Sequence, residues 1–149
     1  MREIKFRGRR LDNGKWESGD LLENQGRNFI YHATSESTIE DNDDGHIVVV
    51  AVEVDPATVG QYTGLKDKNG KKIYEGDIIN WLMHRMDRTG YIEEGRVEFR
   101  TNEQATVVIN KFTTKDGRES VRNILNCLND LKVIGNIHDN PELMKGGDQ

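Results

Sequence analysis

Two aspartates, Asp20 and Asp77, have the residue type and spacing that could do chemistry, because each follows a glycine at a matching position of an internal repeat. Two carboxyls that share a cleft acquire different pKa values, so that one serves as an acid and the other as a base. The alternative is structural: in a Gly-Asp turn, glycine permits the bend and aspartate accepts a hydrogen bond from a nearby backbone N–H. We favour the turn, since a catalytic role depends on a geometry that the sequence does not contain.

Metal-binding residue types are present but are not spaced for a metal site. No two of the four histidines are four residues apart, the spacing that places two imidazoles on one helix face; they are His32, His46, His84 and His138. The segment from Glu40 to Ala51 matches the early positions of a calcium loop, but Ala51, its twelfth residue, has no carboxylate for bidentate coordination. We therefore expect a solvated acidic loop, no metal and no cofactor.

Motifs of the common enzyme classes are missing from the sequence. It contains no nucleophile elbow, no phosphate-binding loop and no dinucleotide-binding fingerprint. Cys127 is the only cysteine, so it has no partner for an internal disulfide or a redox pair, and we expect it to pack in the core. We therefore expect a protein that is not an enzyme and has no small-molecule substrate.

Basic side chains gather near the N-terminus and around one turn, where they form the candidate binding surface. It comprises Arg7, Arg9, Arg10, Lys66, Lys68, Lys71 and Lys72, with Tyr62, Tyr74 and Trp81 as aromatic residues that could stack on bases. The formal net charge of −5 argues weakly against a polyanion partner. Alternation along residues 3–7 also makes Lys5 and Arg7 an ordinary solvent face. We favour that interpretation and keep nucleic-acid binding as the alternative.

These residues lie on two stretches that predict similar hairpins, Phe6 to Leu22 and Tyr62 to Ile79. An aromatic-x-Gly pattern, Asn-Gly-Lys and Gly-Asp followed by two apolar residues recur in the same order, which favours a duplicated, pseudo-symmetric hairpin. The centre of the second stretch predicts a two-residue type I′ turn, which needs positive φ at both central residues. The expected structural turn residues are Asn13, Gly14, Gly19, Asp20, Asn69, Gly70, Gly76 and Asp77.

Short alternating or continuous apolar segments predict strands over most of the remaining chain. The run from Ile47 to Val54 predicts a strand buried on both faces, and residues 95–100 and 105–112 predict a hairpin with Val97 and Phe99 facing the core. Apolar residues at helical spacing predict one short C-terminal helix at about 119–130. Residues 35–46 are acidic and rich in turn formers, and we expect a mobile loop there.

A chain of 149 residues fits a single domain, 1–149, which could consist of two pseudo-symmetric β subunits, about 1–54 and 55–144, that share a core. The longest apolar run, Ile47 to Val52, is far shorter than the ~20 residues of a membrane-spanning helix. No apolar segment follows the basic N-terminal residues, so they do not predict a signal peptide. We expect a cytoplasmic protein without a membrane partner.

Four pieces of the sequence resemble one known family. They are residues 5–8 with 14–16, residues 58–67 (Thr-Val-Gly-Gln-Tyr-Thr-Gly-Leu-Lys-Asp), residues 73–79 (Ile-Tyr-Glu-Gly-Asp-Ile-Ile) and residues 133–143 (Val-Ile-Gly-Asn-Ile-His-Asp-Asn-Pro-Glu-Leu). They are similar to the YopX family of phage and prophage proteins. The resemblance implies a largely β fold with the character of an SH3-like barrel or sandwich of short antiparallel strands, and self-assembly. It implies no established activity and no catalytic residues.

The leading hypothesis is a phage- or prophage-encoded, non-enzymatic β protein in the cytoplasm of a bacterial host. It would act as a homo-oligomer or by binding a protein of the phage or the host. The alternative hypothesis is a small nucleic-acid-binding regulator, which predicts salt-dependent binding that is lost when Arg7, Arg9 and Arg10 are replaced.

Overall fold

Antiparallel β-strands make up most of the computed structural model, which describes residues 3–32, 38–41, 44–45, 47–128 and 130–145. Helix in these residues is limited to three 3₁₀ turns, η1 (Pro56–Thr58), η2 (Ile124–Cys127) and η3 (Pro141–Met144). The predicted mainly β class is therefore confirmed. The chain divides into two compact units, Met1–Tyr62 and Thr63–Gln149, which are described separately below.

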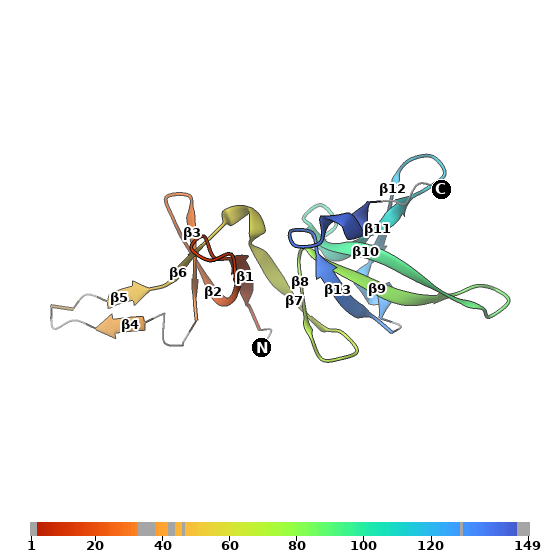
Figure 1. The fold of residues 1–149 in the computed structure, drawn as a ribbon. Coiled ribbons are helices and arrows are strands. Elements are labelled where there is room, and N and C mark those ends of the chain that lie inside the picture. The colour runs from red at the N-terminus through yellow and green to blue at the C-terminus, as the bar shows by residue number, and fades with distance from the viewer. Residues whose placement is uncertain (1–2, 33–37, 42–43, 46, 129, 146–149) are drawn as a thin grey trace. The chain divides into compact units, whose positions relative to one another are not determined.

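The first unit is built on an antiparallel sheet (Figure 1). In spatial order its strands are β6 (Val52–Val54), β3 (Arg27–Tyr31), β2 (Trp16–Asn24) and β1 (Phe6–Arg9). Beyond β1, Arg10 forms an isolated antiparallel bridge with Val54, and the Leu11 N–H donates to the Glu53 carbonyl at 3.2 Å. The inner face of the sheet buries Ile30 and Val54, which are 1% and 0% exposed.

Two glycines allow this sheet to pack closely. A Cβ added to Gly8 would lie 2.7 Å from Val54 Cγ2, and one added to Gly19 would lie 2.0 Å from the Tyr31 carbonyl oxygen. Neither glycine has a positive φ. Close approach, rather than a special backbone conformation, therefore requires glycine at both positions.

A separate two-stranded hairpin lies between β3 and β6 in the sequence. It consists of β4 (Thr38–Asp41) and β5 (Ile47–Val50), and Figure 1 shows it as an arm next to β6. The prediction of one strand buried on both faces at 47–54 is wrong, because Ala51 separates β5 from β6 and Val48, Val49 and Val50 are 40–46% exposed. Residues 38–41 of the expected acidic loop form β4, while residues 35–37, 42–43 and 46 lie outside the described residues.

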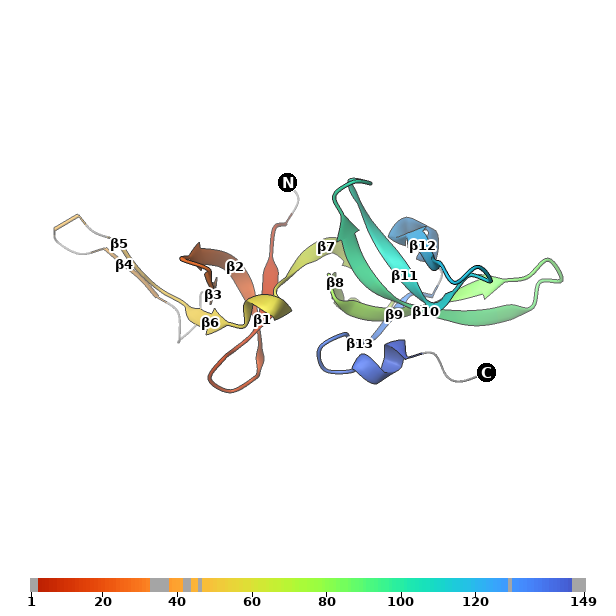
Figure 2. The ribbon, with the colours of Figure 1, turned by 90° about the horizontal axis from the view of Figure 1, so that it is seen from above.

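Strand β7 (Gly60–Lys66) runs from the first unit into the second, where it pairs with β8 (Lys72–Tyr74). The second unit then forms a five-stranded antiparallel sheet. Its strands, in spatial order, are β12 (Glu119–Asn123), β11 (Ala105–Thr113), β10 (Gly90–Arg100), β9 (Asp77–His84) and β13 (Lys132–Asn136). Figure 2 shows the long hairpin made by β9 and β10.

One buried apolar cluster of the second unit lies on one face of this sheet, while Ile78, Val107 and Ile109 are buried on the other face. It contains Ile73, Ile79, Trp81, Val97, Val108, Ile124, Cys127, Leu131 and Val133. The expected inward position of Val97 is confirmed at 2% exposure, but that of Phe99 is wrong, because Phe99 is 45% exposed. Alternation places Phe99 on the same face as Val97, but Phe99 is the penultimate residue of β10 and lies at the end of the strand, beyond the core.

The predicted helix at about 119–130 is wrong. Residues Glu119–Asn123 form β12, which pairs with β11, and only Ile124–Cys127 form a 3₁₀ turn, where the Asn123 side chain accepts from the Leu125 N–H at 2.9 Å. Ile124 and Cys127 are buried, whereas Leu125 is 59% exposed. Ile124 and Cys127 are three residues apart, which matches the period of a 3₁₀ turn. The preceding residues, 119–123, form hydrogen bonds with the edge of β11 instead of continuing a helix.

The expected SH3-like barrel is not confirmed, because the described strands form no closed barrel. Closure requires the outermost strands of a sheet to pair with each other. In the second unit β12 and β13 are the two outermost strands, and each pairs on one side only within the described residues.

Candidate functional site

Asp77 and Gly76 form a buried turn at the start of β9. Gly76 has a φ of +84°, and its N–H donates to the Val97 carbonyl at 2.9 Å. Asp77 is 1% exposed, and its Oδ2 accepts the Tyr74 N–H at 2.8 Å. The carboxylate therefore holds the β8–β9 connection together, as the turn interpretation describes.

Asp20 has a different environment, although it matches Asp77 in the repeat. It lies within β2 opposite Tyr31, and its Oδ1 is 3.5 Å from Lys5 Nζ with 59% of the side chain exposed. The preceding Gly19 is a strand residue that Tyr31 approaches closely. The structure thus departs from the expected turn at Asp20. Asp20 is therefore a surface ion-pair partner of Lys5, and Asp77 is a buried acceptor for the Tyr74 N–H. Neither environment is that of two carboxyls that share a proton.

The Asn69-Gly70 turn differs from the predicted type I′ geometry, and the Asn13-Gly14 turn has the same feature. Gly14 and Gly70 have φ of +71° and +80°, but neither Asn13 nor Asn69 has a positive φ. In the first turn Asn13 Oδ1 accepts the Lys15 N–H at 2.9 Å. In the second turn Asp67, rather than Asn69, supplies the organising side chain. Side-chain acceptors therefore close both loops, which removes the need for a second residue with positive φ.

Asp67 accepts three backbone N–H groups and so joins its own turn to β13, a role that sequence analysis missed. Its Oδ1 accepts the N–H groups of Asn69 (2.8 Å) and Lys71 (2.9 Å), and its Oδ2 accepts the Val133 N–H of β13 at 3.1 Å. The side chain is 7% exposed. Burial acts to raise the pKa of Asp67, but the three N–H donors outweigh it and hold the pKa below its usual value. Asp67 therefore fixes the lysine-bearing turn onto the sheet.

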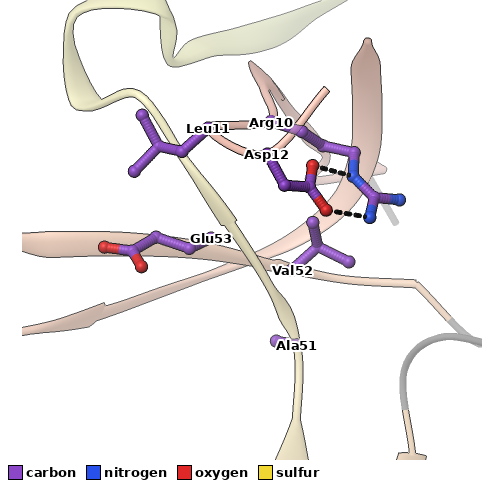
Figure 3. A pocket seen from close by; sticks show the side chains of 6 residues that line it. All are labelled: Arg10, Leu11, Asp12, Ala51, Val52 and Glu53. Carbon is purple, nitrogen blue, oxygen red and sulfur yellow. Dashed lines mark hydrogen bonds and ion pairs between the residues drawn. The ribbon is translucent and has the colours of Figure 1, made fainter. Parts of the chain in front are cut away.

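Arg10 is neutralised by neighbouring carboxylates. Its Nε and Nη2 donate to the two carboxylate oxygens of Asp12 at 2.8 and 2.6 Å (Figure 3). Its Nη1 donates to Glu17 Oε1 at 3.3 Å. The hydrogen bonds from Arg10 hold the pKa of Asp12 below its usual value. The hollow of about 310 Å³ beside this pair is lined by residues 10–12 and 51–53. Because two carboxylates balance the charge of the Arg10 guanidinium, Arg10 attracts a phosphate only weakly.

The rest of the candidate basic surface is divided between structural and solvent-exposed roles. The Arg7 guanidinium stacks on the Trp16 ring at 4.8 Å, and Lys68 Nζ lies 3.0 Å from Asp130 Oδ1. Lys66 and Lys71 are exposed, and Arg9 and Lys72 are half-buried. The aromatic residues that the nucleic-acid alternative requires for stacking are buried: Tyr62, Tyr74 and Trp81 are 4%, 9% and 0% exposed. Their rings are closed to a nucleobase.

An apolar groove lies on the outer face of the first unit. It has a volume of about 400 Å³ and is lined by Leu22, Asn24, Phe29, Val49, Val50 and Ala51. Leu22 and Phe29 are directly opposite each other on β2 and β3. Arg27 stacks on Phe29 at 5.1 Å and forms a bidentate pair with Glu53 at 2.8 and 2.7 Å. This exposed ion pair lies beside Phe29 and forms a charged rim at the border of the groove.

The β4–β5 arm extends this apolar surface. Its exposed side chains are Ile39 (55%), Val48 (40%), Val49 (43%) and Val50 (46%). Val49 and Val50 also line the groove, so groove and arm are continuous. Ile39 and Val49 are cross-strand partners on one face of the arm, and Val48 and Val50 point to the opposite face. The sequence shows the run of valines, but this pattern is the same for an exposed strand and a buried one. The sequence therefore could not show that the arm is exposed.

Metal ligands are not gathered in the described residues, where no group of three or more His, Cys, Asp and Glu side chains is placed to hold an ion. Residues 42, 43 and 46 of the calcium-like segment lie outside that part of the chain. Cys127 is 0% exposed, and burial raises the pKa of its thiol to about 11. A protonated, inaccessible thiol is not a nucleophile.

The comparisons with known proteins identify the family. The family model of YopX protein matches residues 5–145, nearly the whole chain. The chain belongs to the YopX family. Among solved structures, this YopX-family chain resembles protein EF1440 from Enterococcus faecalis with a TM-score of 0.52 and 22% sequence identity, over 97% of this chain and 100% of that one. At this identity the likeness concerns the fold alone.

No curated protein matches this YopX-family sequence at a significant level. None of the described helices is long or apolar enough to cross a membrane. The chemistry of the site therefore has to be argued from its own side chains. They offer an apolar groove, an exposed apolar arm and a charged rim, which suit the binding of a polypeptide.

Proposed function

We propose that this YopX-family chain is a non-enzymatic protein that acts by binding a polypeptide through the apolar groove and the β4–β5 arm. The observation that carries the proposal is the continuity of these two surfaces at Val49 and Val50. The family resemblance motivates the setting, a phage or prophage protein acting in the cytoplasm of its bacterial host.

The energetics support contact with another chain. Covering a half-exposed Val or Ile side chain contributes roughly 1 kcal/mol at about 25 cal/mol per Å². Ile39, Val48, Val49 and Val50 are each 40–55% exposed. Ile39 and Val49 share one face of the arm and Val48 and Val50 the other, so a partner on one face gains roughly 2 kcal/mol before the entropic cost of association, and Leu22 and Phe29 in the groove would add to it. A partner that covers both groove and arm is needed for a stable complex.

The residues that could do chemistry have structural roles instead, which further supports a binding protein. Asp77 and Asp67 accept backbone N–H groups, and Asp20 faces a lysine on the surface. Arg10 is held by Asp12 and Glu17. Nucleic-acid binding is the weaker alternative, since the net charge is −5 and the expected stacking rings are buried.

Affinity capture with matched variants tests the proposal. Wild-type chain, Val49→Asp and Ile92→Asp would be immobilised and exposed to lysate from phage-infected and lysogenic cells. Ile92 is the control, because it is 55% exposed on β10 of the second unit. We expect a protein, or further copies of this chain, retained by wild type and Ile92→Asp and lost with Val49→Asp. That protein should then bind purified wild type in calorimetry.

Identical retention by all three proteins would contradict the proposal, because binding would not involve the arm. The nucleic-acid alternative has its own measurement, the fluorescence anisotropy of labelled DNA and RNA at low salt. Salt-dependent binding that is lost when Arg7, Arg9 and Arg10 are replaced by alanine would favour it over protein binding.

A further inference from the structure

The net negative charge of this chain belongs entirely to the first unit. Residues 1–62 contain 7 Lys and Arg against 12 Asp and Glu, whereas residues 63–149 contain 14 of each kind. Between Arg27 and Lys66 the sequence has no Lys or Arg, and this stretch includes the β4–β5 arm and β6. The apolar surface of the proposed function therefore lies in the acidic unit.

Each face of the arm combines apolar side chains with a carboxylate. Cross-strand pairing puts Ile39 opposite Val49, and Glu40 opposite Val48. Because side chains alternate along a strand, Asp41 shares the face of the first pair and Val50 shares the face of the second. Glu40 and Asp41 are exposed, and neither forms an ion pair within the described residues. Whichever face a partner covers, it meets two apolar side chains and one carboxylate without a counter-charge.

A polar hollow adjoins the apolar groove, and Ala51 lines both. The charged side chains of this hollow and their ion-pair partners are three carboxylates and two guanidinium groups, those of Asp12, Glu17, Glu53, Arg10 and Arg27. Arg27, which stacks on Phe29 in the groove, is held by Glu53 and adds no net charge to the rim. The border of the groove therefore has an excess of one negative charge.

We propose that the polypeptide bound by the groove and the β4–β5 arm is a cationic amphipathic segment, in which Lys or Arg side chains accompany apolar ones. This inference rests on the proposed function and specifies the chemistry of its partner. The apolar side chains of the segment cover one face of the arm and the groove. Its cations lie beside Asp41 or Glu40 and beside the hollow.

The charge distribution selects this partner over the others. A second copy of this chain brings the same acidic surface to the contact, and a nucleic acid brings phosphates, so both are repelled. A neutral apolar chain would cover Glu40 or Asp41 without a counter-charge, and taking an unpaired carboxylate out of water is costly. A segment that carries cations avoids this cost while it covers the same apolar side chains.

Fluorescence anisotropy with three labelled peptides tests the inference. The peptides alternate valine with lysine, with serine or with glutamate, so they share their apolar content and differ in charge. At low salt we expect the full-length wild type to bind the lysine peptide most tightly and the glutamate peptide least. The differences should shrink at high salt, because screening weakens exposed charge pairs.

Two double variants with the same change in net charge locate the effect. Glu40→Gln with Asp41→Asn removes two carboxylates from the arm, and Asp116→Asn with Glu142→Gln removes two exposed carboxylates from the second unit. The arm variant should bind the lysine peptide about three-fold more weakly at low salt and the serine peptide at least as tightly as wild type. The second-unit variant should bind both peptides as wild type does.

Two results would overturn the inference. One is equal affinity of wild type for the lysine and glutamate peptides. The other is an equal loss of lysine-peptide binding in the two double variants, because the attraction would then be general rather than placed on the arm. Binding of no peptide would also overturn it, and the proposed function would then be decided by the capture experiment with Val49→Asp.

Val49→Ser with Val50→Ser separates the inference from the proposed function, because it removes one apolar side chain from each face of the arm. We expect it to weaken binding of the lysine and serine peptides alike. If wild type binds all three peptides equally and this variant weakens all of them, the inference is wrong and the proposed function stands. If the variant binds every peptide as wild type does, both are wrong.

Discussion

Asp67 should hold together the turn between β7 and β8 and the adjacent strand β13, and its replacement tests this role directly. The carboxylate accepts three backbone N–H groups, and one of them, that of Val133, belongs to a residue that is 7% exposed. Asp67→Asn removes the charge and keeps one acceptor oxygen. Asp67→Ala removes both oxygens.

The size of the effect follows from these contacts. A hydrogen bond to a charged group contributes about 1.5–3 kcal/mol, and a buried N–H left unsatisfied costs about 1–3 kcal/mol. The N–H groups of Asn69 and Lys71 lie near the surface and regain water, so the buried Val133 N–H dominates the loss. We expect the free energy of unfolding of the second unit to fall by about 2 kcal/mol in Asp67→Asn and about 4 kcal/mol in Asp67→Ala.

The two tryptophans provide the assay, because Trp16 lies in the first unit and Trp81 in the core of the second. Urea unfolding in a Trp16→Phe background reports the second unit through Trp81 fluorescence. Asp20→Asn is the control, since its exposed ion pair contributes at most about 0.5 kcal/mol.

The pH dependence gives a second check. The folded-state pKa of Asp67 is lowered from its usual value of 3.8, so its contribution is complete above that value and is lost as the pH falls through the folded pKa. The difference between wild type and Asp67→Asn should therefore be largest near neutral pH and shrink under acid conditions. A difference of the same size in acid, or a loss below about 0.5 kcal/mol in Asp67→Ala, would refute the role of the charged carboxylate.

Three further results are expected. Gly8→Ala should destabilise the first unit by about 1–3 kcal/mol, measured by Trp16 fluorescence, because its Cβ would meet Val54 at 2.9 Å or less. Adding Val54→Ala should recover part of this loss, and additive effects of the two substitutions would contradict the contact. Ile124→Ala should cost about 2–4 kcal/mol and Leu125→Ala less than about 1 kcal/mol, measured by urea unfolding, whereas equal costs would favour an amphipathic helix. Cys127 should react with a thiol reagent only on unfolding, since it is buried with a pKa of about 11, and rapid labelling of the native chain would contradict its burial.

Local patterns in the sequence determine the β class. Apolar residues that alternate with polar ones along a short segment are typical of a strand with one buried face. This pattern predicts a strand even when its neighbours in the sheet are unknown. The glycine of each Asn-Gly pair is likewise a local requirement, and Gly14 and Gly70 both have positive φ. A residue is therefore predictable from its type when its local sequence allows only one backbone conformation or one pattern of burial.

Tertiary structure decides the outcome where one sequence pattern is compatible with two different structures. A continuous valine run suits a buried strand and an exposed arm equally, and the outcome depends on which segments come to cover it. The apolar spacing at 121–131 fits a helix, but the open edge of β11 offers residues 119–123 a ladder of hydrogen bonds instead. Gly19 and Gly76 match in the repeat, yet one is required by close packing and the other by a turn.

The candidate site shows the same division. The sequence alone shows charges and aromatic rings around the 61–79 turn, which favours a solvated face and leaves a nucleic-acid-binding surface with stacking rings as the alternative. The fold buries Tyr62 and Tyr74 and turns Asp67 toward Val133, a residue 66 positions away along the chain. Burial and long-range hydrogen bonds depend on segments that meet only after folding. For this reason the sequence determines the β character and the turn glycines of this protein, while only the tertiary structure decides which apolar surfaces are buried and which remain exposed.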